Sequence, residues 1–542
     1  MKIWIASASA LMLACACSAS KEATAALTAM NLQDGTSSPI VKYEGKSGSG
    51  DTVTLKNVVL GPSGSGGLKA ASLVLGGLDV TDAGKPVVTS ITLKGVTPEQ
   101  ALPKGMAFNL STISIEGLNP VTGEFIASAF TKEGQGTPPP FEQWGFSKVS
   151  INGMTFTSDG ATEIPGKINV QLGELSLSDL KNTLFGNAHL SGLKGDFDVP
   201  PEAAGFPVKG TFDFGTSDIK NIRGKLFEEA VAAGMSAASD PTAMAGLNTK
   251  IMESLGSPID PGYDAFTWTG MNIDAAGAKL AVSKVDQKVT RNAQGIATAI
   301  STPRTTIAFT ADSAGGAIGQ QATLGLAMVG YPSSKIELYG EGDATYDPAT
   351  DTTRYVKSNF GLTDAVDFSM TGGVQGLTKA LGALLDAADK MQSSMTAPAS
   401  GADPTAPPTP SQPDFTEIAN LKIVDLDLTI TDKTLVNFVL GVAAMGSGGD
   451  IETRRKDIVN QIAALPGALP PGSVDKAVSS EFSNAIAAFM KQPGSLNIKL
   501  KPAQPMALGA MGAGPVTKQQ LGFSATFTPS PTPPAPAPKP AQ

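Results

Sequence analysis

Apolar and polar residues alternate in a six-residue pattern that recurs between residues 53 and 180. Its first, third and sixth positions are apolar, and its second position is usually Thr or Ser. Apolar residues at every second position predict a half-buried β-strand, because successive side chains of a strand point to opposite faces. The six copies begin at Val53, Leu73, Ile91, Ile113, Val149 and Leu175.

The fifth position of the pattern interrupts the alternation, so that the next apolar residue arrives one place late. Its occupants are Asn57, Gly77, Gly95, Gly117, Gly153 and Asp179. These residue types tolerate positive φ, and they therefore predict a bulge or a strand end at this position. A bulge would return the following residue, such as Val58 or Leu78, to the apolar face.

The spacing of the copies predicts the connectivity. Most copies begin roughly 20 residues apart, which fits a strand, a turn and a return strand but not a crossover helix. We therefore expect a mainly β protein with helical insertions (α+β), built as a long curved antiparallel meander of repeated hairpins. An open sheet of about 12 or more strands must curl, split or close.

The first and third positions of all copies are expected to share one face of this sheet. They are Val53, Leu55, Leu73, Leu75, Ile91, Leu93, Ile113, Ile115, Val149, Ile151, Leu175 and Leu177. Two interpretations remain open. The face either packs against other protein elements or lines an apolar groove that binds lipid. Core packing is favoured, because apolar residues at period two usually pack against protein.

The N-terminus has the features of an export signal. Lys2 precedes a short apolar run that ends in Met12-Leu-Ala-Cys15, and we expect residues 1–14 to be a signal peptide. The run resembles a bacterial lipobox, which makes Cys15 the expected lipidation site and Cys17 the fallback. The alternative is ordinary cleavage after Ala14-Cys-Ala16, which would give a soluble periplasmic or secreted protein.

The rest of the chain divides by composition and periodicity. Helices are expected at about 433–445, 451–464 and 474–491. The expected segments are an N-terminal tether at 15–50, a β-hairpin repeat domain at 51–224, a helical insertion at 225–257, a second β region at 258–376, a helix at 377–395, a disordered linker at 396–414, an α+β region at 415–528 and a Pro-rich disordered tail at 529–542.

Composition limits the available chemistry. The chain has one histidine and two cysteines, both cysteines in the leader region, so neither a His/Cys zinc site nor a Cys nucleophile is expected. A Ser-His-Asp site would have to use His189, which we expect to be a partly buried strand or turn residue. A net charge of −9 without a basic patch argues against a nucleic-acid partner. No pair of carboxylates is placed for glycoside hydrolysis, and we expect no cofactor, no metal and no enzymatic activity.

Two pieces of the chain resemble uncharacterised exported proteins of alphaproteobacteria. One piece contains Tyr339, Gly340, Gly342, Ala344 and Tyr346-Asp-Pro348, followed by residues 362–376. The other runs over residues 488–505 and continues with Leu521-Gly-Phe-Ser-Ala525. The repeated strand pattern is also similar to β-rich envelope proteins of the AsmA type, which implies a curved sheet and a role in lipid handling but no catalytic residues.

These observations lead to two functional hypotheses. The first is a non-enzymatic lipoprotein on the periplasmic side of the outer membrane, anchored through its N-terminal lipid, with a β-rich scaffold that binds other envelope components. The alternative is a lipid-binding or lipid-transfer module whose apolar β face forms a groove for phospholipid. They differ in whether the apolar face is covered.

Overall fold

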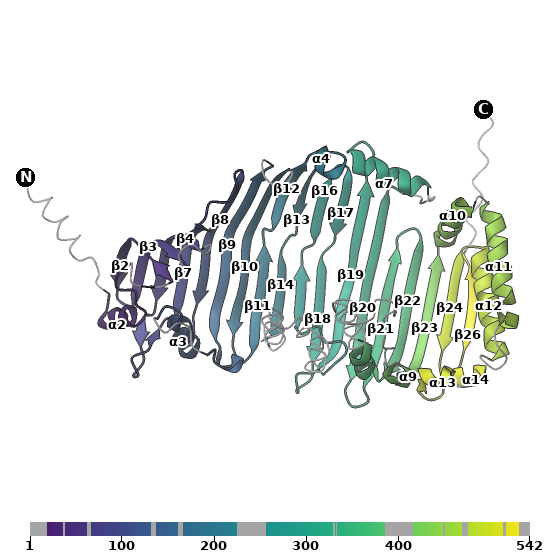
Figure 1. Cartoon of the computed structure of the whole chain (residues 1–542). Coiled ribbons are helices and arrows are strands. Elements are labelled where there is room, and N and C mark those ends of the chain that lie inside the picture. The colour runs from purple at the N-terminus through teal and green to yellow at the C-terminus, as the bar shows by residue number, and fades with distance from the viewer. Residues whose placement is uncertain are drawn as a thin grey trace, which may run out of the picture. The chain divides into compact units, whose positions relative to one another are not determined.

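The computed structural model confirms the expected fold class, a mainly β protein with helical insertions (Figure 1). It describes residues 19–35, 38, 40–61, 67–131, 137–160, 166–224, 256–328, 331, 333–384, 416–447, 450–468, 475–512 and 516–530. The expected signal peptide, most of the helical insertion, the linker at 396–414 and the tail from residue 531 lie outside these residues.

The chain forms two compact units. Unit 1 comprises residues 1–228 and 263–276, and unit 2 comprises residues 229–262 and 277–542. The segment from 265 to 275 was expected in a second β region but belongs to unit 1. The reason is strand pairing: β15 (Ala265–Trp268) pairs with β14 (Ser217–Arg223), and β16 (Met271–Ala275) pairs with β13 (Val208–Asp213).

Unit 1 is an antiparallel meander in which strands β3 to β14 mostly follow one another in space as they do in sequence (Figure 1). Its remaining strands are β1 (Val41–Lys42), β2 (Gly45–Ser49), β3 (Thr52–Leu60), β4 (Leu68–Gly76), β7 (Ser90–Pro98), β8 (Met106–Glu116), β9 (Phe146–Asp159), β10 (Lys167–Leu180), β11 (Leu184–Ser191) and β12 (Lys194–Val199), with β5 (Asp79–Val80) and β6 (Pro86–Val87) as a separate hairpin. Its helices are α2 (Lys21–Ala29), α3 (Pro120–Ser128), α4 (Pro201–Ala204) and the 3-10 turn η1 (Phe141–Gln143).

The predicted backbone change at the fifth pattern position is confirmed in all six copies. The φ angles are +52° at Asn57, +61° at Gly77, +62° at Gly95, +62° at Gly117, +67° at Gly153 and +57° at Asp179. Half of the copies place this residue inside a strand, and the other half place it at or near a strand end. Both predicted outcomes, a local irregularity and a strand end, therefore occur.

A simple bulge would insert one extra residue into one strand of a pair. The residue at the fifth position is not such an insertion, which corrects the expectation of a bulge. On β3 and β4 the pairs Lys56–Ser72 and Val58–Ala70 keep the same register on both sides of Asn57. On both paired strands, the alternation of side chains between the two faces shifts at the same position. The pairing therefore continues unbroken, and the next apolar residue points to the apolar face again. Val58 is accordingly buried.

The expected N-terminal tether is partly folded. Within residues 15–50 the structure contains helix α2, strands β1 and β2, and the fully buried Met30 and Leu32. Helix α2 begins because the Ser20 hydroxyl accepts a hydrogen bond from the Ala23 N–H at 3.0 Å. Its alanine-rich apolar face is small, and the composition therefore appeared too polar to form a core element.

Unit 2 combines an antiparallel sheet with helices at its C-terminal end. Its strands are β17 (Ala278–Val282), β18 (Val285–Arg291), β19 (Ala297–Ala311), β20 (Lys335–Asp347), β21 (Thr352–Leu362), β22 (Val366–Gln375), β23 (Lys422–Asp432), β24 (Gly494–Leu500), β25 (Met506–Ala507) and β26 (Ser524–Pro529). Its helices are α7 (Ala317–Met328), α9 (Thr416–Asn420), α10 (Leu435–Ser447), α11 (Ile451–Ala468), α12 (Lys476–Lys491), α13 (Leu508–Gly512) and α14 (Lys518–Leu521), and residues 377–384 are also helical.

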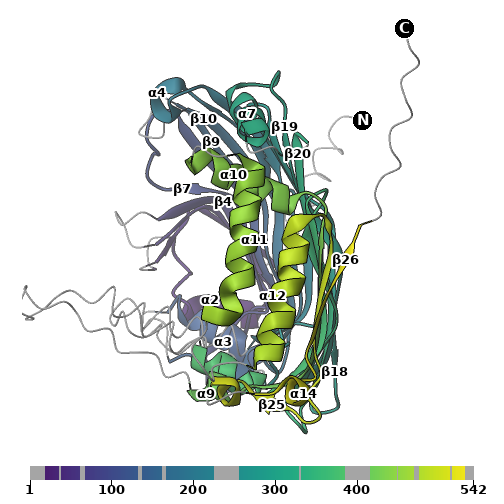
Figure 2. The same ribbon diagram turned by 90° about the vertical axis from the view of Figure 1, so that its right-hand side faces the viewer.

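The three helices expected near residues 433–491 are confirmed as α10, α11 and α12. Helix α12 lies against β24 and β26, and α11 packs beside α12 (Figure 2). Val478 and Phe489 of α12 share a buried cluster with Leu496 of β24 and Ala525 of β26. This helical layer covers the apolar face of unit 2 at its C-terminal strands.

The polar face of unit 2 carries a ladder of ion pairs. Lys357 lies 2.8 Å from Glu341, and Lys433 lies 2.9 Å from Asp367. Hydrogen bonds from Lys357 and Asn359 hold the pKa of Glu341 below its usual value. Burial would raise the pKa of Asp367, but hydrogen bonds from Tyr339 and Lys433 outweigh it and lower the pKa.

The stability of unit 2 is expected to decline at acid pH because of these carboxylates. A carboxylate whose pKa is lower in the folded state stabilises the fold at pH values above its unfolded pKa, which is 4.5 for Glu341 and 3.8 for Asp367. This stabilisation is lost as the pH falls through the folded pKa. Asp432, whose pKa is raised by burial, acts in the opposite direction. Urea unfolding at pH 7 and pH 3 should show the loss. Glu341→Gln should reduce the difference, and an unchanged pH dependence in that variant would contradict the assignment.

Candidate functional site: an uncharged sheet face

The structure brings all twelve sequence-predicted apolar residues together in unit 1. They form two transverse rows in which each residue directly opposes its neighbour on the next strand. Row A consists of Leu55, Leu73, Leu93, Ile113, Ile151 and Leu175. Row B consists of Val53, Leu75, Ile91, Ile115, Val149 and Leu177. Directly opposed residues of an antiparallel sheet share one face.

The same face continues beyond the predicted rows. A third row beyond the phase change contains Val58, Ala70, Val96, Leu110, Met154 and Leu172. Rows A and B extend through Leu190 and Ala188 of β11 to Trp268 and Phe266 of β15. None of the residues named in these rows is charged, whereas lysines such as Lys56 and Lys94 lie on the opposite face.

Coverage of this face falls from the first strands towards β10. On β3 and β4 the two rows are buried in one cluster with Leu27 of α2 and Ala127 of α3. Ile113 and Ile151 are only partly buried against that cluster, and Leu175 on β10 is 41% exposed. The predicted core packing is therefore confirmed for the first strands, whereas Leu175 presents a large apolar side chain to solvent.

The opposite face of unit 1 contains the chain's single histidine. His189 lies on β11 between Ser176 of β10 and Asp218 of β14, directly opposite both. Its Nδ1 lies 2.8 Å from the Asp218 carboxylate, and its side chain is partly buried, as expected. The order Ser-His-Asp therefore occurs across three neighbouring strands, which the sequence alone did not reveal.

The serine of this row is engaged elsewhere. Hydrogen bonds from Lys148 and then from Ser176 lower the pKa of Glu174. A hydroxyl has a single proton to donate, so the Ser176 proton is directed to Glu174 and not to His189. Lys148 also forms an ion pair with Glu174 at 2.7 Å. The row is thus a cross-strand polar network that stabilises the sheet.

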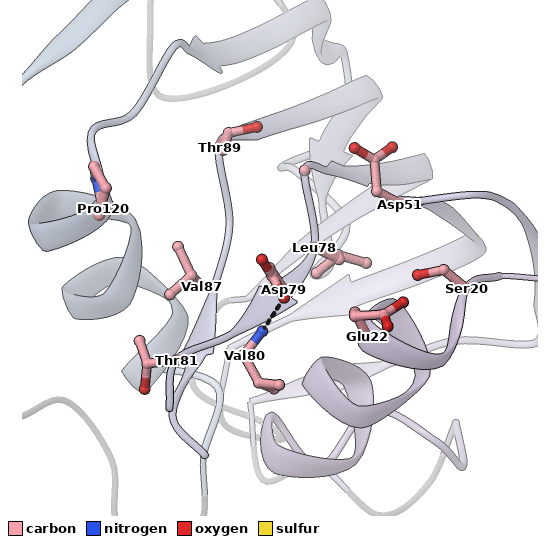
Figure 3. A pocket seen from close by; sticks show the side chains of 11 residues that line it. Ser20, Glu22, Asp51, Leu78, Asp79, Val80, Thr81, Val87, Thr89 and Pro120 are labelled. Carbon is pink, nitrogen blue, oxygen red and sulfur yellow. Dashed lines mark hydrogen bonds between the residues drawn. The ribbon is translucent and has the colours of Figure 1, made fainter. Parts of the chain in front are cut away.

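A pocket of about 590 Å³ lies at the N-terminal end of unit 1 (Figure 3). Figure 3 shows Glu22 and Asp51 on one side and Val87 and Pro120 on the other, with Asp79 between them. The carboxylates of Glu22, Asp51 and Asp79 line it, and none of the described residues around it is basic. This charge disfavours a phosphate or fatty-acid headgroup, so the pocket does not suit an anionic lipid.

The remaining site predictions are only partly accessible. Cys15 and Cys17 lie outside the described residues. Within the part of the chain that the structure describes, no group of His, Cys, Asp and Glu is arranged to hold a metal ion. Among the same residues, no helix has the length and apolarity needed to cross a membrane.

Comparison with known proteins gives limited information. A family of uncharacterised proteins matches residues 359–527, which cover the end of β21, strands β22 to β25, most of β26 and the helices that cover this end of unit 2. No curated protein matches the chain. No solved structure matches it either.

Proposed function

We propose that this protein is a non-enzymatic lipid-binding protein of the bacterial cell envelope. The uncharged face of unit 1 holds the acyl chains of a phospholipid, and an N-terminal lipid on Cys15, with Cys17 as the fallback, anchors the protein to the periplasmic side of the outer membrane. The observation that carries the proposal is the combination of continuous uncharged rows with coverage that falls to 41% exposure at Leu175.

Physical chemistry supports acyl chains as the ligand. Burying apolar surface contributes about 25 cal/mol per Å², and rows A and B offer apolar side chains only from β3 to β10. An acyl chain carries no donors or acceptors that the face would leave unsatisfied. Leu175 and its partly exposed neighbours Leu177 and Leu190 would provide the contact surface for the chain. The likeness to AsmA-type proteins agrees with this proposal through the strand pattern alone.

Leu175→Asp is expected to abolish lipid co-purification. A carboxylate in the open part of the face would have to be desolvated on ligand binding, which is strongly unfavourable. A chain that starts at Ser18, and therefore lacks both candidate lipidation sites, is purified without detergent and measured by native mass spectrometry, followed by solvent extraction. We expect phospholipid at defined stoichiometry in the wild type and none in the variant.

Ser178→Asp is the matched control, because it introduces the same charge on the same strand but on the opposite face. It should retain the lipid, and circular dichroism should show that both variants are folded. A lipid-free wild type would contradict the proposal and leave a membrane-tethered scaffold as the function. Equal lipid content in the two variants would also contradict it.

A further inference from the structure

The apolar face of unit 2 has a gap in its side-chain layer at the middle of β20. Gly340 and Gly342 occupy successive positions on this face, where Leu338 precedes them on the same strand. A Cβ atom built on Gly340 would have no neighbour within 4 Å, and one on Gly342 would meet only the Lys357 carbonyl oxygen at 3.6 Å. Open space therefore lies above both glycines.

Large apolar side chains border this space. Leu338 is 49% exposed, and Phe360, directly opposite Gly340 on β21, is 46% exposed. Phe360 stacks on Phe368 with ring centroids 4.8 Å apart and planes at 9°. Ile307 of β19, opposite Leu338, is 43% exposed. We call Gly340, Gly342, Leu338 and Phe360 the glycine site.

The dimensions of the glycine site limit what it can bind. Side chains are missing from one strand only, so the space is about 4.8 Å wide, the spacing of neighbouring strands. A helix, about 10 Å across, is too wide. An extended peptide would fit, but the polar side chains directly opposite the glycines are only Thr302, Thr305 and Ser358. Three hydroxyls cannot pair the two polar groups of every peptide residue, and each N–H or C=O group left unpaired would cost several kcal/mol.

We propose that the glycine site binds a single acyl chain, laid over Gly340 and Gly342 and held between Leu338 and Phe360. An extended hydrocarbon chain matches the width of the space and has no polar groups along its length. The site lies in unit 2 and is separate from the rows of unit 1. Only the choice of a lipid as the ligand rests on the proposed function.

Photolabelling with a diazirine analogue of palmitic acid tests this site directly. The full mature chain is irradiated with the probe, and labelled peptides are mapped by mass spectrometry. We expect label on the peptide that contains Phe360. In Gly340→Leu the new side chain fills the space, and labelling of this peptide should fall to the level of a sample kept in the dark.

Gly340→Leu is expected to fold, because the glycine does not have a positive φ and its Cβ direction is open. Gly325→Leu on α7 is the matched control, since Gly325 also has open space around a Cβ, and it should label like the wild type. If Gly340→Leu fails to fold, Phe360→Ser, which removes one side of the site, should give the same loss of label.

Each distribution of label has a separate meaning. Label on the unit 1 rows but not on the Phe360 peptide overturns the glycine site and leaves the proposed function standing. Label on the Phe360 peptide that persists in Gly340→Leu also overturns it. Label confined to that peptide and lost in Gly340→Leu supports the glycine site and counts against lipid binding by unit 1.

Discussion

Replacing Asp260 by alanine is expected to lower the free energy of unfolding by about 3–5 kcal/mol, the range for removing one partner of a buried ion pair. The side chain of Asp260 is fully buried, and that of Arg291 is 12% exposed. Arg291 Nη2 donates to Asp260 Oδ1 at 2.8 Å, and Nη1 contacts Oδ2. The Gly262 N–H also donates to Asp260 at 2.8 Å. Alanine would remove the buried carboxylate that contacts both Arg291 nitrogens and would take away the acceptor of the Gly262 N–H.

The control for this change is Asp425→Ala in the same unit. Asp425 also pairs with an arginine, Arg354, at 2.9 Å, but both side chains are substantially exposed. An exposed pair contributes about 0–1 kcal/mol, so this variant should unfold almost like the wild type. Urea unfolding followed by circular dichroism compares the two. Equal losses in both variants would refute the role assigned to burial.

Gly77→Ala is expected to cost roughly 2–5 kcal/mol of unfolding free energy, the sum of two effects. Gly77 has a φ of +61°, where a residue with a Cβ is strained by about 1–2 kcal/mol. In addition, the Cβ would lie 1.9 Å from Oγ1 of Thr89, the residue just before β7, so that the end of β4 and the start of β7 would have to separate. The measurement is the urea midpoint of the purified chain.

Gly50→Ala separates the two effects. Gly50 has nearly the same φ, +59°, but a Cβ there meets nothing within 4 Å. This variant should lose only the conformational part, about 1–2 kcal/mol. Gly77→Ala combined with Thr89→Ala should recover part of the larger loss, because the second change removes the hydroxyl. A Gly77→Ala variant no less stable than Gly50→Ala would show that the clash relaxes without cost.

Local sequence was sufficient to predict the strands of unit 1 and their shared apolar face. The period-two pattern and the Gly, Asn or Asp at its fifth position are properties of neighbouring residues, and they fix side-chain direction and φ through backbone sterics. All six fifth positions, including the non-glycine residues Asn57 and Asp179, have positive φ. The three helices of unit 2 at 435–491 were predicted for the same reason, since their periodicity is local.

Features that depend on distant partners were not predictable from sequence. Asp260 and Arg291 are 31 residues apart, and His189 meets Asp218 29 residues away, so nothing in their local sequence identifies the pairing. Helix α2 was missed because its alanines bury little surface individually and become core residues only when α2 packs against the β5–β6 hairpin and joins the buried cluster of β3 and β4.

The sequence by itself determined that one face of unit 1 is apolar and lacks charge, because alternation alone sets which side chains share a face. Only the tertiary structure decided how far that face is covered. The helices α2 and α3 bury its first strands, whereas Leu175 remains exposed. The tertiary structure also decided that open space lies above Gly340, opposite Phe360. The space above a glycine depends on the side chains of neighbouring strands and not on its own position in the sequence.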